Sequence, residues 1–123
     1  MRTILVIDDN QSVLTCLELL LAAHGYEARS ANGGVEGLAI AETFPVAAAL
    51  VDVHMPGMSG IEVCRKLRAS LPSRPVWLMT GAWSREIEKL GLEAGARAVW
   101  RKPLDLPQLL AGLAEAVSLV SGE

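Results

Sequence analysis

Residues 46–60, VAAALVDVHMPGMSG, are the stretch from which the fold of this chain is best deduced. The run Val46–Val51 is short and apolar throughout, which is typical of a central strand of a parallel sheet. The predicted strand, Val46–Val53, carries Asp52 near its end, and Met55-Pro56-Gly57 then turn the chain. Because parallel sheets bind ligands beyond the carboxyl ends of their strands, Asp52 is a candidate for site chemistry.

Short apolar runs alternate with segments of helical period along the whole chain. The predicted strands are Ile4–Ile7, Tyr26–Ala31, Val46–Val53, Val76–Thr80 and Ala98–Arg101. Each precedes a predicted helix, and these begin at Asn10, Gly34, Ser59, Ser84 and Asp105 and reach about Gly25, Thr43, Ser70, Glu93 and Val120. A strand–helix order repeated five times predicts right-handed crossovers and a parallel sheet with helices on both faces. The more polar strand Tyr26–Ala31 is expected near an edge.

Length and composition indicate one globular domain, predicted to span residues 1–123. The chain is 51% hydrophobic and carries a net charge of −3, which argues against a general affinity for nucleic acid or anionic membranes. There is no apolar run of about 18 residues, and no signal-peptide pattern at the N-terminus, so a cytoplasmic location is expected. Cys16 and Cys64 lie within predicted helices among leucines and valines, and both are predicted to be buried thiols.

Five polar residues fall at the carboxyl ends of four predicted strands: Asp8, Asp9, Asp52, Thr80 and Lys102. Each alone has an ordinary explanation: an aspartate can cap a helix, a threonine can end a strand, and a lysine is usually solvated. Together, in a sheet of order 2-1-3-4-5, they meet in one crevice. Three carboxylates repel one another there, and Mg²⁺, which prefers oxygen ligands, relieves this. With Lys102 the formal charges cancel, which suits a site for a phosphoryl group.

The chain resembles the receiver domain of two-component response regulators over about residues 2–120. The resemblance rests on VIDDN (6–10), DVHMPGMSG (52–60), MTG (79–81), AGA (94–96) and RKP (101–103). It implies a flavodoxin-like (βα)₅ fold with strand order 2-1-3-4-5. It also implies a phosphoacceptor that switches its partner interactions, with catalysis limited to its own phosphorylation and dephosphorylation.

The resemblance assigns a role to each candidate residue. Asp52 is the expected acceptor of a phosphoryl group from the phosphohistidine of a histidine kinase or histidine phosphotransfer protein. Asp9 and Asp52 are expected to ligate Mg²⁺ (or Mn²⁺) directly, Asp8 through water, and His54 through its backbone carbonyl. Thr80 corresponds to the switch hydroxyl. Lys102 corresponds to the lysine that pairs with the phosphoryl group, and the bond from Lys102 to Pro103 to one that is cis in the family.

Three positions depart from the family pattern or are open in function: Val99, Trp83 and His54. Val99 stands where many receivers carry a tyrosine or phenylalanine that turns inward, so a muted or different aromatic switch is expected. Trp100, one residue later, should point to the opposite face and pack under the last helix. Trp83 is either an anchor for a partner, a gate over the pocket, or a partly packed loop aromatic. The His54 side chain either influences phosphoryl hydrolysis or is simply solvated.

The first predicted helix is the expected kinase docking surface by resemblance, and the domain is expected as a monomer or a phosphorylation-dependent homodimer. The output domain or downstream partner stays open, and no direct nucleic-acid or membrane binding is expected. One alternative is an unphosphorylated pseudo-receiver, which the complete set of five polar residues disfavours. Another is a small phosphatase or phosphotransferase with an aspartyl intermediate, disfavoured because His54 stands two residues after Asp52 where a second acid is needed. A P-loop nucleotidase is excluded because the chain has no GxxxxGK[ST] stretch.

Overall fold

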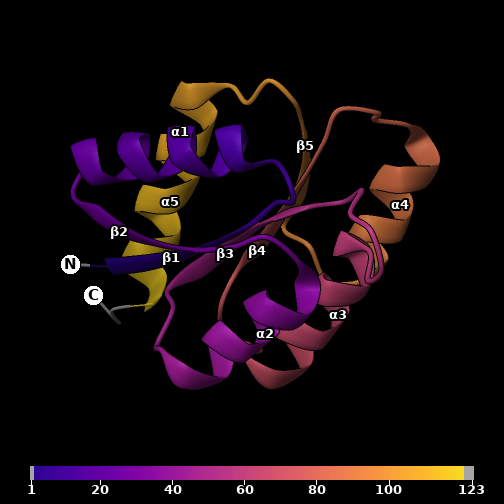
Figure 1. Ribbon diagram of the computed structural model, residues 1–123, viewed down its shortest axis with the longest axis horizontal. Helices are drawn as coiled ribbons and strands as arrows, with labels where there is room; N and C mark the ends of the chain where they lie inside the picture. The colour runs from indigo at the N-terminus through magenta and orange to yellow at the C-terminus, as the bar shows by residue number, and fades with distance from the viewer. Residues whose placement is uncertain (1, 121–123) are drawn as a thin grey trace.

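A computed structural model describes residues 2–120, with side chains through residue 116, as five successive strand–helix units (Figure 1). Met1 and residues 121–123 of the predicted domain lie outside the described residues. The elements are β1 (Arg2–Ile7), α1 (Gln11–Ala23), β2 (Tyr26–Ala31), α2 (Gly34–Thr43), β3 (Ala48–Asp52), α3 (Gly60–Ser70), β4 (Val76–Thr80), α4 (Arg85–Glu93), β5 (Ala98–Arg101) and α5 (Leu106–Val120). The strands form one parallel sheet in the order β2-β1-β3-β4-β5. The predicted fold and strand order are confirmed.

The sheet is covered on both faces, as its apolar strands require. Helices α1 and α5 lie on one face and α2, α3 and α4 on the other (Figure 1). Because side chains alternate along a strand, each strand contributes to both cores. In β1, for example, Ile4 and Val6 pack with the α1 and α5 side, and Leu5 and Ile7 with the other.

The strand ends differ from the sequence prediction by a few residues. Strand β1 begins at Arg2 rather than Ile4, because Arg2 and Thr3 continue the pairing with β2. Strand β3 covers Ala48–Asp52, shorter at both ends than the predicted Val46–Val53. At its far end, Val53 still donates to the carbonyl of Met79 (3.0 Å), but its own carbonyl turns to accept from Gly60 (2.9 Å). The ladder therefore stops just after Asp52.

The two neighbours Val99 and Trp100 point to opposite faces, as the alternation predicts. The indole of Trp100 is buried in the core on the α1 and α5 side and stacks on Trp77, with ring centroids 5.4 Å apart and planes 14° from parallel. Gly112 of α5 lies directly over this pair. Val99 is buried in the opposite core. The predicted packing of Trp100 under the last helix is confirmed.

The prediction of two buried thiols is right for Cys64 and wrong for Cys16. Leu14, Leu17 and Leu21 form the buried face of α1, and the side chain of Cys16 lies outside that face and is exposed. Cys64 is fully buried against the sheet, and its thiol lies 3.7 Å from the carbonyl oxygen of Ala94. Burial raises the pKa of the Cys64 thiol to about 11.

We therefore expect the two thiols to differ sharply in reactivity. Since the thiolate is the nucleophile, Cys64 is inert at mildly alkaline pH both because it is buried and because its pKa is high. Iodoacetamide should add one group to the native protein and two after denaturation, as counted by intact mass. A Cys16→Ser variant should accept none in the native state. Rapid native modification of that variant would contradict the packing of α3 described here.

Candidate functional site

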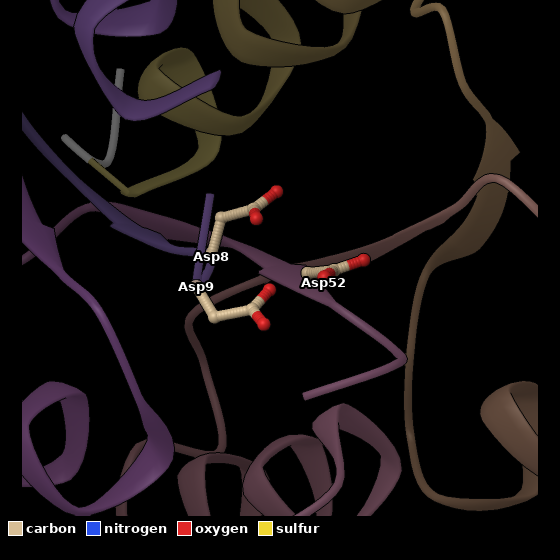
Figure 2. A group of neighbouring side chains, drawn as sticks. All are labelled: Asp8, Asp9 and Asp52. Atoms are coloured by element: carbon tan, nitrogen blue, oxygen red, sulfur yellow. The ribbon is translucent and has the colours of Figure 1, made fainter. Parts of the chain in front are cut away.

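The carboxyl ends of β1 and β3 bring three carboxylates together. Asp8 and Asp9 follow directly after β1, and Asp52 is the last residue of β3, which is the neighbour of β1 in the sheet. One carboxylate oxygen from each lies within 4.8 Å of the others, and Figure 2 shows the three side chains around a common space. The predicted convergence of these aspartates at one edge of the sheet is therefore found in the structure.

Asp8 is held by hydrogen bonds in a fully buried position. One of its carboxylate oxygens accepts the backbone N–H of Asn10 (2.9 Å), and the other accepts the Nζ of Lys102 (2.7 Å). The side chain of Asn10 in turn caps α1 by accepting the N–H groups of Ser12 and Val13. The start of α1 thus fixes both the orientation of Asp8 and the path of the chain past Asp9.

Lys102 connects the last strand to the carboxylates of the first and third. It follows β5, and its Nζ lies 2.7 Å from Asp8 Oδ2 and 3.3 Å from Asp52 Oδ1. Its backbone N–H donates to the carbonyl of Thr80 (2.8 Å), and the peptide bond to Pro103 is cis, as predicted. Burial lowers the pKa of Lys102, but the hydrogen bond to Asp8 and the charges of Asp52 and Asp8 outweigh it, so the net shift is upward. The ammonium stays charged.

Asp52 is nearly buried, and its ionised form is disfavoured. Desolvation raises the pKa of its carboxyl, and the charges of Asp8 and Asp9 raise it further, while Lys102 opposes them. The net shift is upward from the ordinary value of 3.8. A nearby cation would stabilise the ionised form of Asp52, because it offsets both the desolvation of the carboxylate and its repulsion by the other two.

This shift predicts that Asp52→Asn stabilises the metal-free protein at neutral pH. A carboxyl whose pKa is higher in the folded than in the unfolded state lowers the free energy of unfolding once it ionises. This loss of stability is absent at pH values below the pKa of the unfolded state and complete at pH values above the pKa of the folded state. The variant should therefore melt at a higher temperature than wild type at pH 7 in EDTA, and the difference should vanish below about pH 3.5. A difference independent of pH would contradict it.

Gly60 allows α3 to begin directly beside Asp52. Its N–H donates to the carbonyl of Val53, and a Cβ on Gly60 would lie 2.0 Å from the backbone oxygen of Asp52. No side chain fits there without moving the end of β3. The motif predicts that Ser59 and Gly60 start the helix, as they do, but the close approach between backbones leaves no residue-type signal other than the glycine itself.

Thr80 is fully buried at the end of β4, and its hydroxyl is engaged with the loop that follows. Its Oγ1 accepts the backbone N–H of Ala82 at 3.0 Å. Since Thr80 pairs with Arg101 across the sheet and Asp52 with Met79, the hydroxyl belongs to the same strand-end region as Asp52 and Lys102. All five residues singled out from the sequence thus lie at this edge.

The donor set fits a hard divalent cation. Three carboxylates within reach of one another offer oxygen ligands and the negative charge that Mg²⁺ or Mn²⁺ requires. The side chain of His54 is exposed beyond β3, and the role of its backbone carbonyl stays a prediction. Each carboxylate oxygen of Asp8 already accepts one hydrogen bond, from Asn10 or from Lys102, and its role as a ligand through water stays a prediction.

Comparison with known proteins places this site in a family. A sequence model described as the response regulator receiver domain matches residues 4–114. The chain belongs to the response regulator receiver domain family. It is therefore a receiver domain of the two-component signalling systems, with the CheY-like, flavodoxin-like fold that its strand order shows.

Some relatives of this receiver domain match it over almost their whole length, and others are about twice as long. A solved receiver domain protein (CheY-like) from Methanospirillum hungatei superimposes with a TM-score of 0.92 at 31% identity, covering 99% of this chain and 98% of that one. Response regulator MprA from Mycobacterium leprae is 38% identical over 88% of this chain and 47% of its own length. An uncharacterized transcriptional regulatory protein, YkoG of Bacillus subtilis, is 35% identical over 93% of this chain and 50% of its own. The chain thus spans about half the length of these curated relatives.

Two further features of the receiver domain complete its description. Trp83, in the loop between β4 and α4, is partly buried against the core, and the guanidinium of Arg101 lies 4.2 Å from its ring centroid. The sequence offered no sign of this cation–π contact because it joins two segments 18 positions apart with no shared motif. Within residues 2–120, no helix has the length and apolar character needed to cross a membrane.

Proposed function

We propose that this receiver domain accepts a phosphoryl group on Asp52 from a phosphohistidine, with Mg²⁺ bound by the three aspartates. The observation that carries the proposal is the joint placement of Asp8, Asp9 and Asp52 around one space with Lys102 in contact with two of them. A nucleophilic carboxylate beside fixed positive charge is what phosphoryl transfer requires from a protein.

The chemistry follows from the position of each group. A carboxylate oxygen of Asp52 bonds to phosphorus as the bond from phosphorus to the imidazole nitrogen breaks, and the histidine leaves as neutral imidazole after taking a proton. Mg²⁺, when bound, supplies neutralisation of the phosphoryl oxygens. Lys102 stands 3.3 Å from Asp52 and supplies a second positive charge, and the Thr80 hydroxyl and the Ala82 N–H supply hydrogen bonds if they exchange their mutual bond for the phosphoryl oxygens.

The phosphoryl donor is proposed to dock on α1. A cleft of about 800 Å³ runs between α1 and the loop after β5, and it reaches Lys102 at one end. Its walls are mostly apolar and include Val13, Leu17, Leu20, Leu104 and Leu106. A helix of a histidine kinase or histidine phosphotransfer protein resting here would present its histidine close to Asp52. The switched partner is proposed to be an output domain, since YkoG is a longer protein whose name describes transcriptional regulation.

The acceptor chemistry is tested by labelling with a small phosphodonor. Wild-type protein incubated with acetyl phosphate and Mg²⁺ should gain the mass of one phosphoryl group, and EDTA should reduce labelling to background because the three carboxylates then repel the anion. Mn²⁺ should restore it. Absence of labelling with either metal would favour the pseudo-receiver, and continuous release of phosphate from many small phosphoesters would favour an enzyme of broader activity.

The docking surface is tested by a variant that spares the acceptor chemistry. Val13→Arg places a charge in the wall of the α1 cleft without touching the three aspartates or Lys102. We expect labelling by acetyl phosphate to be unchanged and transfer from a phosphorylated histidine phosphotransfer protein to fall at least about tenfold, the effect of losing about 1.4 kcal/mol of binding. Glu42→Gln, on the exposed end of α2, serves as the control. An equal loss in both assays would point to damage at the site itself.

A further inference from the structure

We propose that the contact between Trp83 and Arg101 is the element that transmits phosphorylation of Asp52 to the α4–β5–α5 surface, in place of an aromatic at position 99. The inference deepens the proposed function and rests on it. It concerns how the signal leaves the site, which the acceptor chemistry alone does not determine.

Position 99 has no means of moving a ring. Val99 is 7% exposed and covered by α4 at Gly91, where an added Cβ would lie 2.7 Å from Val99 Cγ2 and 2.8 Å from Leu78 Cδ1. The helix therefore lies as close to Val99 as a glycine permits. Valine has no ring to rotate, and the side of Val99 that faces Gly91 leaves no room for a larger side chain.

Among the chain's aromatic residues, Trp83 is the one whose position allows it to respond to phosphorylation of Asp52. There are five, three tryptophans, one tyrosine and one phenylalanine. Trp77 and Trp100 are buried in a stacked pair on the α5 side of the sheet. Tyr26 belongs to the edge strand β2. Phe44 follows α2, and its ring is covered by Arg29 of β2. Trp83 remains, three residues after Thr80.

The two partners of the contact are attached to different parts of the site. Arg101 is the last residue of β5, paired in register with Thr80 and followed by Lys102. Trp83 lies in the loop after β4, where the N–H of Ala82 is bound to the hydroxyl of Thr80 at 3.0 Å. A phosphoryl group on Asp52 competes for that hydroxyl and that N–H. If the bond breaks, the loop moves with Trp83 while Arg101 stays with the sheet.

The contact therefore belongs to the unphosphorylated state and opens on phosphorylation. A hollow of about 350 Å³ lies beside it, bordered by Trp83, Val99, Arg101 and Gln108 of α5. Because valine leaves this space unfilled, displacement of the indole changes the shape of the surface between α4 and α5. Breaking an exposed cation–π contact costs little free energy. The energetic coupling between phosphorylation and this contact is therefore small, and the change is reversible.

The first measurement follows the three indole N–H signals by two-dimensional ¹⁵N NMR, with Trp83→Phe identifying the signal of Trp83. On full phosphorylation, or with beryllofluoride and Mg²⁺ as a stable mimic, the Trp83 signal should shift more than those of Trp77 and Trp100. In Arg101→Gln without phosphodonor, it should lie displaced toward the phosphorylated position. Arg101→Lys, which keeps a cation, should behave like wild type.

The second measurement is the initial rate of labelling at Asp52 by acetyl phosphate. If the contact holds the loop in its unphosphorylated form, removing it raises the population of the competent form. Trp83→Leu and Arg101→Gln should each label about two- to fivefold faster than wild type, the range expected for one exposed cation–π contact. Arg29→Gln removes the matched contact with Phe44, whose ring centroid is 3.9 Å from the guanidinium, and should not change the rate.

The outcomes separate this inference from the proposed function. No labelling of wild type overturns the proposed function and the inference with it. Full labelling at Asp52 with the Trp83 signal unmoved overturns the inference alone. Rates of Trp83→Leu and Arg101→Gln at or below wild type do the same.

Discussion

Asp52→Asn is expected to abolish phosphoryl labelling altogether. The asparagine keeps the size and position of the side chain at the end of β3, but a neutral amide oxygen is a poor nucleophile toward phosphorus and a weaker ligand for Mg²⁺. Intact mass after incubation with acetyl phosphate and Mg²⁺ should show no added phosphoryl group, at times when wild type is fully labelled. Because Asp52 ionises against desolvation, the loss comes without a loss of fold.

The matched control for this variant is Asp9→Asn. It removes one charge from the same cluster of carboxylates but leaves the nucleophile in place. We expect its labelling to recover in part at high Mg²⁺ concentration, whereas that of Asp52→Asn should not. Equal labelling of Asp52→Asn and wild type would move the acceptor to another residue, and peptide mapping would then locate it.

Gly60→Ala is expected to be the most destabilising conservative change near the site. The new Cβ would overlap the backbone oxygen of Asp52, which belongs to a central strand paired with β4 at this residue and is not part of a flexible side chain. Relief requires α3 to move away from β3 or Asp52 to shift. We expect a loss of about 3 kcal/mol in the free energy of unfolding, seen as a fall in Tm on the order of 10 °C. Labelling of the remaining folded protein should also slow.

The control is Gly81→Ala, another glycine of the strand-end region. A Cβ there meets nothing within 4 Å, and its φ is not in the left-handed region. Its Tm should stay within a degree or two of wild type. If Gly60→Ala melted like Gly81→Ala, the close approach of α3 to Asp52 would be relieved without cost, and the site geometry described here would be wrong.

The sequence was sufficient to predict the fold because its local signals all agree. Apolar strands of four to six residues alternate with capped helices, and Asn10, Ser59 and Ser84 cap the helices that their positions suggested. The ends of β3 were less predictable, since Val46 and Ala47 are as buried as strand residues but precede the strand, which begins at Ala48. Burial and strand pairing are separate properties, and hydrophobicity reports the first.

The sequence was enough to predict which residues meet at the site, but not which hydrogen bonds and ion pairs they form. The family motifs pointed to Asp8, Asp52 and Lys102, yet the pairing of Lys102 with Asp8 at the shorter distance is a result of three-dimensional packing. The exposed position of Cys16 was missed because apolar residues occur on both faces of α1, where Leu19 is exposed as well. The contact of Trp83 with Arg101 was missed because it crosses from a loop to a strand.

The bond between Lys102 and Asp8 also constrains how this domain can be made on the ribosome. The two residues are 94 positions apart, so Asp8 is synthesised long before its cation exists. Until Lys102 has left the exit tunnel, folding of the first four strands would bury the Asp8 carboxylate without its cation, and removing one partner of a buried ion pair costs about 3–5 kcal/mol. A nascent chain that ends before Lys102 should therefore stay accessible to chaperones and proteases, and the acceptor site should form only after Lys102 has emerged from the ribosome.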